Sequence, residues 1–341
     1  THLLGAASEL AEALCPITSK KSGREYSAEL ITTAKELYFE LCAFLEANDD
    51  FDRRWALCTF EDGGAKLLLV DPSEKVRTIT RDFGMCIFFS ATLSPKNYYL
   101  GMLGGEEDNF LELPSPFDRE HLKILTCPIS TLYHDRERTA PLAARIIANA
   151  VEPRVGNYMV FFPSFEYMNR VVEAYRTLRP RDLILCQSPQ MNEKAREEYI
   201  AAFSQKRTVR LLGFAVMGGL FSEGVDLVGD KLLGEVIFGV GMPPPTPEAE
   251  AVRRRFDERE EDGAALGYTY PGFGRVLQSA GRVIRTVNDR GFLILCDERY
   301  LSEGFTSLFP ASWQEPELVD DPEQIEDLIR AFWEEGDEPL P

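Results

Sequence analysis

Residues 158–178 show most clearly the alternation that decides the fold. Tyr158-Met159-Val160-Phe161-Phe162 has the composition of a buried strand, and Pro163-Ser164 separates it from the amphipathic stretch Glu166–Leu178. Similar strand-length runs occur at Leu122–Thr126, Leu183–Gln187, Val209–Ala215, Gly234–Val240 and Phe292–Cys296. Apolar strands that alternate with helices predict an α/β fold, with a parallel sheet covered by helices on both faces.

The N-terminal third has a different texture. Residues 1 to about 60 predict helices, because leucines recur there at helical spacing, at Leu37, Leu41 and Leu45. Beyond them, the apolar runs Ala65–Val70 and Met85–Ser90 predict buried strands bounded by turns. The breakers Gly104-Gly105 and Pro114-Ser115-Pro116 predict a hinge or linker near residues 100–120. A chain of 341 residues suits two domains.

The charge is strongly acidic and unevenly spread. A formal net charge of −19, from 37 basic and 56 acidic residues, argues against a protein that coats DNA with a generic basic surface. From Glu315 onward, eleven acidic residues accompany a single basic residue, Arg330. This composition predicts a solvated helix end with disordered flanks. A regulatory, partner-binding role for the acidic tail is an alternative that rests on charge alone.

Cysteine usage and hydropathy indicate the compartment. The seven cysteines form no C-x-x-C pair, which argues against a zinc ribbon or a disulfide framework and favours a reducing cytoplasm. The three histidines show no ligand spacing, so no metal site is predicted in the chain. No stretch reaches the roughly 18 apolar residues of a membrane helix. The chain begins Thr-His-Leu-Leu without an initiator Met, and we expect it to be part of a longer protein.

Polar residues follow two of the predicted strands, at the carboxyl ends where the working residues of parallel sheets gather. Ser90 and Thr92 come after the apolar residues 86–89, and their hydroxyls can exchange hydrogen bonds between two sites, although a simple ST-turn also explains them. Ser164 follows Phe162 and leads into a helix. For Ser164 the alternatives are a helix start beside core aromatics and a functional contact.

The segment 218–227 (GGLFSEGVDL) is richer in functional groups. It combines three glycines, including Gly224, with the hydroxyl of Ser222 and the carboxylates of Glu223 and Asp226. Glycines allow a backbone to approach a ligand or to adopt positive φ. Acids in such a loop can orient an arginine or a water. A β-turn explains the first two glycines but not the acids, so we predict a functional loop.

The segment 278–285 (QSAGRVIR) carries a pair of arginines. Arg282 and Arg285 are three residues apart, which predicts that they share one face of a helix. Paired guanidinium groups there can bind phosphate oxygens and stabilise charge during phosphoryl transfer. The alternative is a surface helix with snorkelling arginines. Gly281 costs roughly 1 kcal/mol in a helix interior relative to alanine, which predicts a close contact at that residue.

One strand end imitates a magnesium site. Phe292–Cys296 leads into Asp297-Glu298, like the strand and acids that hold Mg²⁺ in nucleotide hydrolases. However, no G-x-x-x-x-G-K-[ST] phosphate loop occurs anywhere in the sequence. We therefore interpret Asp297 as a strand-end acid that makes local ion pairs, with Arg299 as a partner.

Taken in order, these segments resemble motifs III, IV, V and VI of superfamily 2 helicases. The matching stretches are Ser-Ala-Thr-Leu (90–93), Phe-Phe-Pro-Ser (161–164), Phe-Ser-Glu-Gly-Val-Asp (221–226) and Gln-Ser-Ala-Gly-Arg-Val-Ile-Arg (278–285). The form of motif V resembles the DinG/XPD branch, and the stretch GEVIFGVGMP (234–243) resembles bacterial DinG-like members. The resemblance covers about residues 85–315 and indicates the C-terminal part of such a helicase.

The resemblance implies two RecA-like domains with ATP between them, single-stranded DNA across both, and 5′-to-3′ unwinding. It assigns to catalysis, at the γ-phosphate of ATP, residues Gln278, Arg282 and Arg285. It assigns to nucleotide binding residues Glu223, Gly224, Asp226 and Gly281. It assigns to DNA binding and coupling residues Ser90, Thr92, Ser164 and Ser222.

The departures from the family are equally informative. The phosphate-loop lysine, the DEAH acids and the four iron–sulfur cysteines of the family are absent, and in the family all of them precede motif III. ATP and Mg²⁺ are therefore expected in a longer parent protein, an iron–sulfur cluster is possible only there, and this chain alone holds none of them. The implied segments are an arch remnant (1–60), the end of a first RecA-like domain with motif III and a linker (61–118), a second RecA-like domain (119–315) and an acidic tail (316–341).

We therefore expect the C-terminal portion of an ATP-dependent DNA helicase that is monomeric and cytoplasmic, with no membrane attachment. Because the phosphate loop is missing, we expect the chain alone to be inactive. The alternative is a non-catalytic nucleic-acid-binding module that keeps the fold without turnover.

Overall fold

The computed structural model describes residues 2–19, 26–49, 51–61, 63–106, 109–205, 207–219, 221, 227–313 and 315–337. The chain divides into two compact units. The first comprises residues 1–86, 102–104 and 245–263, and the second comprises residues 87–101, 105–244 and 264–341.

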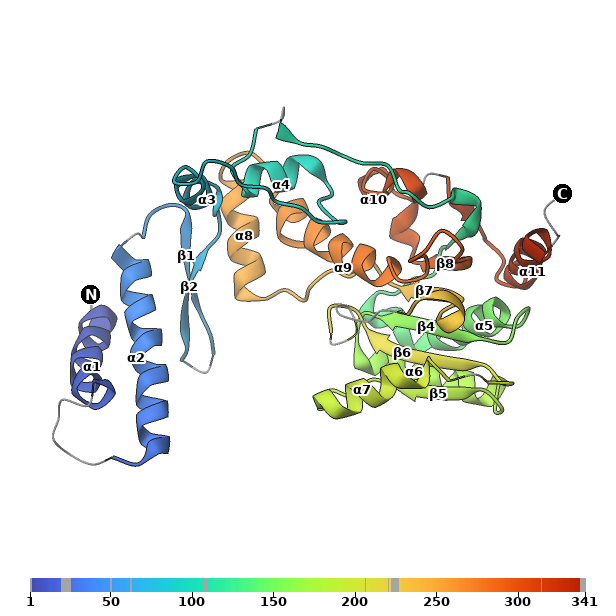
Figure 1. Ribbon diagram of the computed structural model, residues 1–341, viewed down its shortest axis with the longest axis horizontal. Coiled ribbons are helices and arrows are strands. Elements are labelled where there is room, and N and C mark those ends of the chain that lie inside the picture. Colours follow the sequence, from blue (N-terminus) through green and yellow to red (C-terminus); the bar gives the residue numbers. More distant parts are fainter. Residues whose placement is uncertain are drawn as a thin grey trace. The chain divides into compact units, whose positions relative to one another are not determined.

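A parallel sheet forms the centre of the second unit (Figure 1). Its strands are β3 (Leu122–Cys127), β4 (Asn157–Phe162), β5 (Leu183–Cys186), β6 (Leu211–Val216), β7 (Gly234–Phe238), β8 (Gly291–Cys296) and β9 (Glu317–Leu318). They lie in the order β5-β6-β4-β7-β8-β3-β9, and each neighbouring pair runs parallel. The six strands predicted from residue 122 to residue 296 and the parallel sheet are therefore confirmed, whereas β9 was not predicted.

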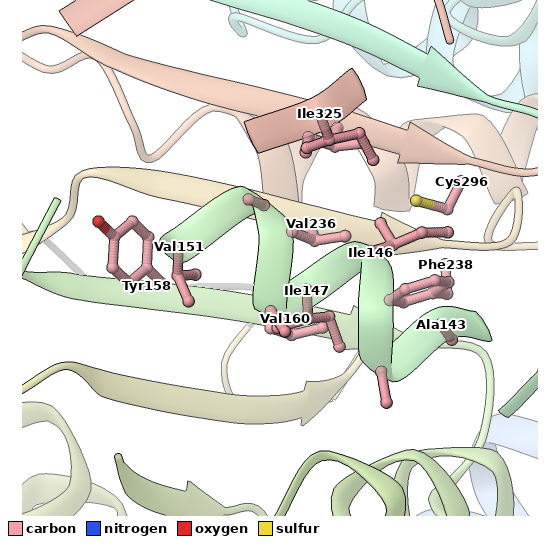
Figure 2. Packing of buried hydrophobic residues seen from close by; sticks show 14 of the residues in the cluster. Ala143, Ile146, Ile147, Val151, Tyr158, Val160, Val236, Phe238, Cys296 and Ile325 are labelled. Carbon is pink, nitrogen blue, oxygen red and sulfur yellow. The ribbon is translucent and has the colours of Figure 1, made fainter. Parts of the chain in front are cut away.

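Helices cover both faces of this sheet. One face packs against α5 (Arg136–Val151), α6 (Phe165–Leu178) and α11 (Gln324–Asp337), and the other packs against α7 (Glu193–Ala202), α9 (Tyr270–Ala280) and α10 (Glu303–Thr306). Along β7, Val236 and Phe238 join the first core and Ile237 joins the second. Figure 2 shows Ile147 of α5 packed on the first face beside Val160 of β4. Alternate residues of one strand enter two apolar cores, which explains the continuous apolar runs in the sequence.

The first unit combines helices with a small antiparallel sheet. It contains α1 (His2–Thr18), α2 (Ala28–Asp49), β1 (Trp55–Thr59), β2 (Ala65–Leu69), α3 (Ser73–Thr80) and α8 (Pro247–Asp257). Helices α1 and α2 confirm the predicted helices up to residue 49, whereas β1 shows that the end of the segment 1–60 is a strand and not a helix. Helix α8 belongs to this unit although in the sequence it lies between β7 and α9 of the second unit. Two ion pairs link it and the residues after it to the rest of the first unit: Lys66 binds Glu248 (3.4 Å) and Arg259 binds Asp71 (2.6 Å). The domain boundaries predicted from the sequence did not assign residues 245–263 to the first unit.

The strand predicted at Met85–Ser90 is wrong. These residues form no strand, and the side chains of Met85, Ile87, Phe88 and Phe89 are exposed, Phe89 by 89%. An apolar run becomes a buried strand only where neighbouring strands pair with it, and no strand of the described part of the chain does so. Helix α4 (Lys96–Met102) follows this run.

The prediction of a solvated helix end with disordered flanks is wrong for the apolar side chains of this segment, because Val319, Ile325, Ile329, Phe332 and Trp333 belong to the core. Strand β9 pairs with β3, and the side chains of Val319, Ile325 and Ile329 are fully buried. Helix α11 turns its apolar side chains toward the sheet and leaves acids such as Asp327 exposed. The prediction relied on net charge, which does not reveal the helical spacing of the apolar residues in α11.

The C-terminal helix should therefore contribute to the stability of the whole second unit. Replacing the fully buried Ile329 with alanine should lower the free energy of unfolding by about 2–5 kcal/mol in urea denaturation, because it leaves a cavity in the core. Glu334→Ala, at an exposed position on the same helix, should change it by less than about 0.5 kcal/mol. Equal, small effects of both changes would show that α11 is not part of the cooperative core.

Candidate functional site

The arginine segment lies at the end of a helix rather than along one. Helix α9 ends at Ala280, Gly281 is its C-cap, and Arg282 and Arg285 lie in the loop that leads to β8. The prediction that both arginines share a helix face is wrong, because the helix stops before them. Gly281 therefore carries no helix-interior cost. The predicted close contact is present but lies within the same helix, because a Cβ there would be 3.2 Å from the carbonyl oxygen of Leu277.

The two arginines have opposite environments. The side chain of Arg282 is 2% exposed, whereas Arg285 and Gln278 are exposed. The loop therefore leaves Arg285 exposed and buries Arg282. Only the exposed residues can meet a ligand without a rearrangement of the loop.

Asp289 fixes the conformation of this loop. The backbone N–H groups of Arg285 and Thr286 each donate to its carboxylate at 2.8 Å, and the Thr286 hydroxyl donates at 2.7 Å. Burial alone would raise the pKa of Asp289, but the hydrogen bonds from Thr286 and from backbone N–H groups outweigh it and hold the pKa below its usual value. The backbone that carries Arg285 is thus held by a buried, ionised carboxylate.

Glu235 is a further charged residue near these arginines, and sequence reasoning missed it. It lies in β7, is fully buried, and neither carboxyl oxygen has a hydrogen-bond partner among the described residues. Burial raises the pKa of Glu235 to about 8, although the positive charges of Arg282 and, second, Arg285 act in the opposite direction. A glutamate inside the apolar run 234–240 was the available signal in the sequence.

The arginine loop and Ser164 lie at opposite ends of the parallel strands, which are called here the amino edge and the carboxyl edge of the sheet. The loop precedes β8 and so lies at the amino ends of the parallel strands, whereas Ser164 follows the carboxyl end of β4. The expectation that working residues gather at carboxyl ends therefore fails for the arginine loop. Strands β4 and β8 have six residues each, which separates the edges by roughly 15–20 Å.

At the carboxyl edge, Ser164 is the N-cap of α6. Its hydroxyl accepts a hydrogen bond from the backbone N–H of Tyr167 (3.3 Å) and one from Arg136 Nη1 (3.2 Å). Phe161 and Phe162, which precede it, are fully buried. The reading of Ser164 as a helix start beside core aromatics is confirmed, and its assignment to DNA stays a prediction.

A hydrogen-bond network joins this edge to two other strand ends. Arg299 donates to both carboxylate oxygens of Asp297, at 2.7 and 2.8 Å, and the Thr131 hydroxyl also donates to Asp297. Arg136 Nε donates to the carbonyl oxygen of Thr131 at 3.0 Å. The interpretation of Asp297 as a strand-end acid paired with Arg299 is confirmed. Sequence reasoning missed Arg136, which lies in none of the motifs.

Ser90 and Thr92 form a local turn. Their hydroxyl oxygens lie 3.1 Å apart, and the backbone N–H of Thr92 donates to Ser90 Oγ at 3.1 Å, as the ST-turn alternative requires. Across the ranges that the structure describes, no hydrogen bond joins them to Ser164 or to the arginine loop. Helix α4, which follows, places Tyr98 against Tyr270 at the start of α9, with ring centroids 5.5 Å apart.

The segment after β6 is described only in part. Gly218 has φ +72°, and a Cβ on Gly219 would lie 2.8 Å from Gln187 Nε2, so the turn and a close approach account for both glycines. Phe221 is buried against Tyr199, with ring centroids 4.2 Å apart. The predicted site residues Ser222, Glu223, Gly224 and Asp226 lie outside the described residues.

No group of three or more His, Cys, Asp or Glu side chains among the described residues could hold a metal ion. No helix in the described ranges is both long enough and apolar enough to cross a membrane.

The parallel sheet with its two-sided helical cover has the fold of a RecA-like helicase domain, and comparison with known proteins supports this class. Residues 147–316 match the family model of a helicase C-terminal domain. The chain is 28% identical over 225 residues to a probable ATP-dependent helicase of Methanocaldococcus jannaschii, covering 63% of this chain and 34% of that protein. It is 25% identical over 228 residues to the ATP-dependent DNA helicase DinG of Photobacterium profundum, covering 64% and 32%.

A solved structure titled XPD_APO shares the fold. It superimposes with a TM-score of 0.60 at 18% sequence identity, and the match covers 84% of this chain and 57% of that one. The chain belongs to the DinG/XPD branch of the superfamily 2 helicases, and residues 147–316 form its helicase C-terminal domain. It spans about a third of the length of the curated relatives it matches.

The buried carboxylate of Asp289 should be required for the arginine loop. Asp289→Asn should lower the free energy of unfolding by about 1–3 kcal/mol, because the amide cannot accept all the hydrogen bonds that the carboxylate does. Because the folded pKa lies below the unfolded value of 3.8, the part of this difference due to charge should be present at pH 7 and lost as the pH falls below about 4. Urea denaturation at both pH values measures it.

Asp230→Asn, at an exposed position in a turn, is the matched control and should leave stability unchanged. If Asp289→Asn behaves like this control at pH 7, Asp289 does not hold the loop.

Proposed function

We propose that this chain supplies the second RecA-like domain of an ATP-dependent, DinG-like DNA helicase that unwinds DNA with 5′-to-3′ polarity as a monomer. One observation carries the proposal: the exposed residue Arg285 lies at a sheet edge, in a loop whose backbone donates hydrogen bonds to the carboxylate of Asp289. An arginine presented from a second domain stabilises the charge that develops on a transferred phosphoryl group. Both curated relatives described above are named as ATP-dependent helicases.

In this proposal the chain completes a nucleotide site that another domain begins. Arg285 and Gln278, which are exposed, contact the γ-phosphate side, with Gly281 next to them. Glu223, Gly224 and Asp226 connect the nucleotide to DNA. The residues present fit only this part of an ATP site, because the sequence contains no phosphate loop. The scattered cysteines do not fit an iron–sulfur cluster.

Single-stranded DNA is proposed to bind at the carboxyl edge. Ser164, at the N-terminus of α6, and Arg136, which donates to it, offer hydrogen bonds to a phosphate. Ser222 extends this contact, and Ser90 and Thr92 couple it to hydrolysis. A nucleic-acid-binding module without ATP turnover, the alternative function, would need only this carboxyl edge to bind DNA. The ordered and exposed Arg285 favours the enzyme.

Arg285 should be essential for turnover but not for folding. In the full-length protein, Arg285→Ala should lower the kcat for ATP by about a thousandfold or more, with an unchanged unfolding transition, because the transition-state charge loses its partner. Arg176→Ala, an exposed arginine on α6, is the control and should retain the ATPase activity. ATPase activity retained by Arg285→Ala would refute this role, and measurable ATPase activity of the chain alone would refute the composite site.

The carboxyl edge should bind single-stranded DNA through phosphates. Fluorescence anisotropy with a labelled oligonucleotide should show weak binding by the chain, with an affinity that falls steeply as salt rises, because phosphate contacts release counterions. Arg136→Ala should weaken binding several-fold, whereas Arg176→Ala should not. If the chain does not bind at low salt, or if both variants bind like the original chain, the proposed DNA edge is wrong.

A further inference from the structure

Arg290 joins the arginine loop to the C-terminal helix. It follows Asp289 directly and precedes Gly291, the first residue of β8. Its Nη2 donates to the backbone carbonyl oxygen of Phe332 in α11 at 2.7 Å. Its guanidinium also lies over the ring of Phe332, 4.4 Å from the centroid, and Phe332 is 5% exposed. A residue of the amino edge is thus bound to α11 by two contacts with the same partner.

A second arginine contacts the same end of α11. Arg154 lies just before β4, and its guanidinium lies over the ring of Trp333, 4.4 Å from the centroid. Helix α11 has no basic residue in its last turn, where Glu334 and Glu335 lie. The C-terminal end of a helix favours nearby cations. Arg154 and Arg290, from the amino ends of two strands, therefore supply positive charge that α11 itself lacks there.

The loop on the other side of Arg290 is closed by hydrogen bonds to a single residue. The carboxylate of Asp289 accepts from the backbone N–H groups of Arg285 and Thr286, each at 2.8 Å. The backbone N–H of Asp289 donates to the carbonyl oxygen of Thr286 at 3.2 Å. All three bonds involve Asp289, so the backbone that carries Arg285 follows the position of Asp289, which is the neighbour of Arg290 in the chain.

We propose that Arg290 is a positioning residue that ties the arginine loop to the C-terminal helix: its contact with Phe332 fixes the backbone at Asp289. A guanidinium that stacks on a ring and donates to a carbonyl oxygen is fixed in direction as well as in place. The backbone of Arg285 is then ordered through the hydrogen bonds that Asp289 accepts. The tie concerns this chain alone, and its consequence for ATP turnover rests on the proposed function.

Amide hydrogen exchange of the chain, followed by NMR, tests this tie. In Arg290→Met the backbone amides of Arg285 and Thr286 should exchange about tenfold faster or more, because losing a hydrogen bond from a charged group lets the loop open more often. The amides of β8 report unfolding of the whole unit, and their exchange should change much less. Arg330→Met is the matched control, because Arg330 binds Glu326 of its own helix, and it should leave the two loop amides unchanged.

Arg290→Lys separates the tie from a general loss of stability. An ammonium group can still donate to the carbonyl oxygen of Phe332 and lie over its ring, so this variant should show a smaller acceleration than Arg290→Met. The proposal is overturned if the loop amides and the β8 amides speed up equally in Arg290→Met, or if the loop amides do not speed up.

A second pair of variants covers the case in which Arg290→Met fails to fold. Phe332→Leu removes the ring from Arg290 but keeps an apolar side chain and the carbonyl oxygen, and it should speed exchange of the two loop amides several-fold. Ile329→Val, a buried change on the same helix, should not. Equal effects of both substitutions would show that only the stability of α11 matters, and the proposal would fail. Neither measurement uses nucleotide or DNA, so failure here is distinct from failure of the proposed helicase function.

Discussion

The parallel pairing of β7 with β8 is the constraint on which the placement of both candidate sites depends. Because the two strands run in the same direction, the chain must return from the carboxyl edge to the amino edge between them, and α9 makes this return. A Cβ at Gly272, near the start of α9, would lie 2.9 Å from the backbone of Met242, in the loop after β7. Helix α9 ends at Ala280, and Arg282 and Arg285 follow in the loop that leads to the start of β8. The same helix thus touches both edges.

This arrangement has a mechanical consequence for the proposed function. The proposed nucleotide contact at Arg285 and the proposed DNA contact at Ser164 lie at opposite edges of one close-packed sheet. Within this domain, the packed elements that join the two edges are the central strands, which are buried on both faces, and α9. Glu235 lies within this body, on β7, and its carboxyl group is fully buried.

The sequence predicted the parts of the fold whose signal is local. The strands of the second unit were predictable because burial on both faces makes each of them a continuous apolar run, as in Tyr158–Phe162. Predictions failed where the deciding fact was not local. The run Met85–Ser90 has the composition of a strand but no neighbour that pairs with it, and the acids of α11 concealed Ile325 and Ile329. The prediction that Arg282 and Arg285 share a helix face assumed that the helix continues past Gly281. No rule of sequence spacing could place Arg136 beside Ser164, because these residues come from different elements.

Hydrogen–deuterium exchange of the full-length protein tests most directly whether nucleotide binds at the amino edge, near Arg285, and DNA at the carboxyl edge, near Ser164. Addition of a non-hydrolysable ATP analogue should slow exchange in residues 282–289, and addition of single-stranded DNA should slow it in residues 131–136 and 164–167. The account would be contradicted if the nucleotide protected the carboxyl-edge segments and left residues 282–289 unchanged.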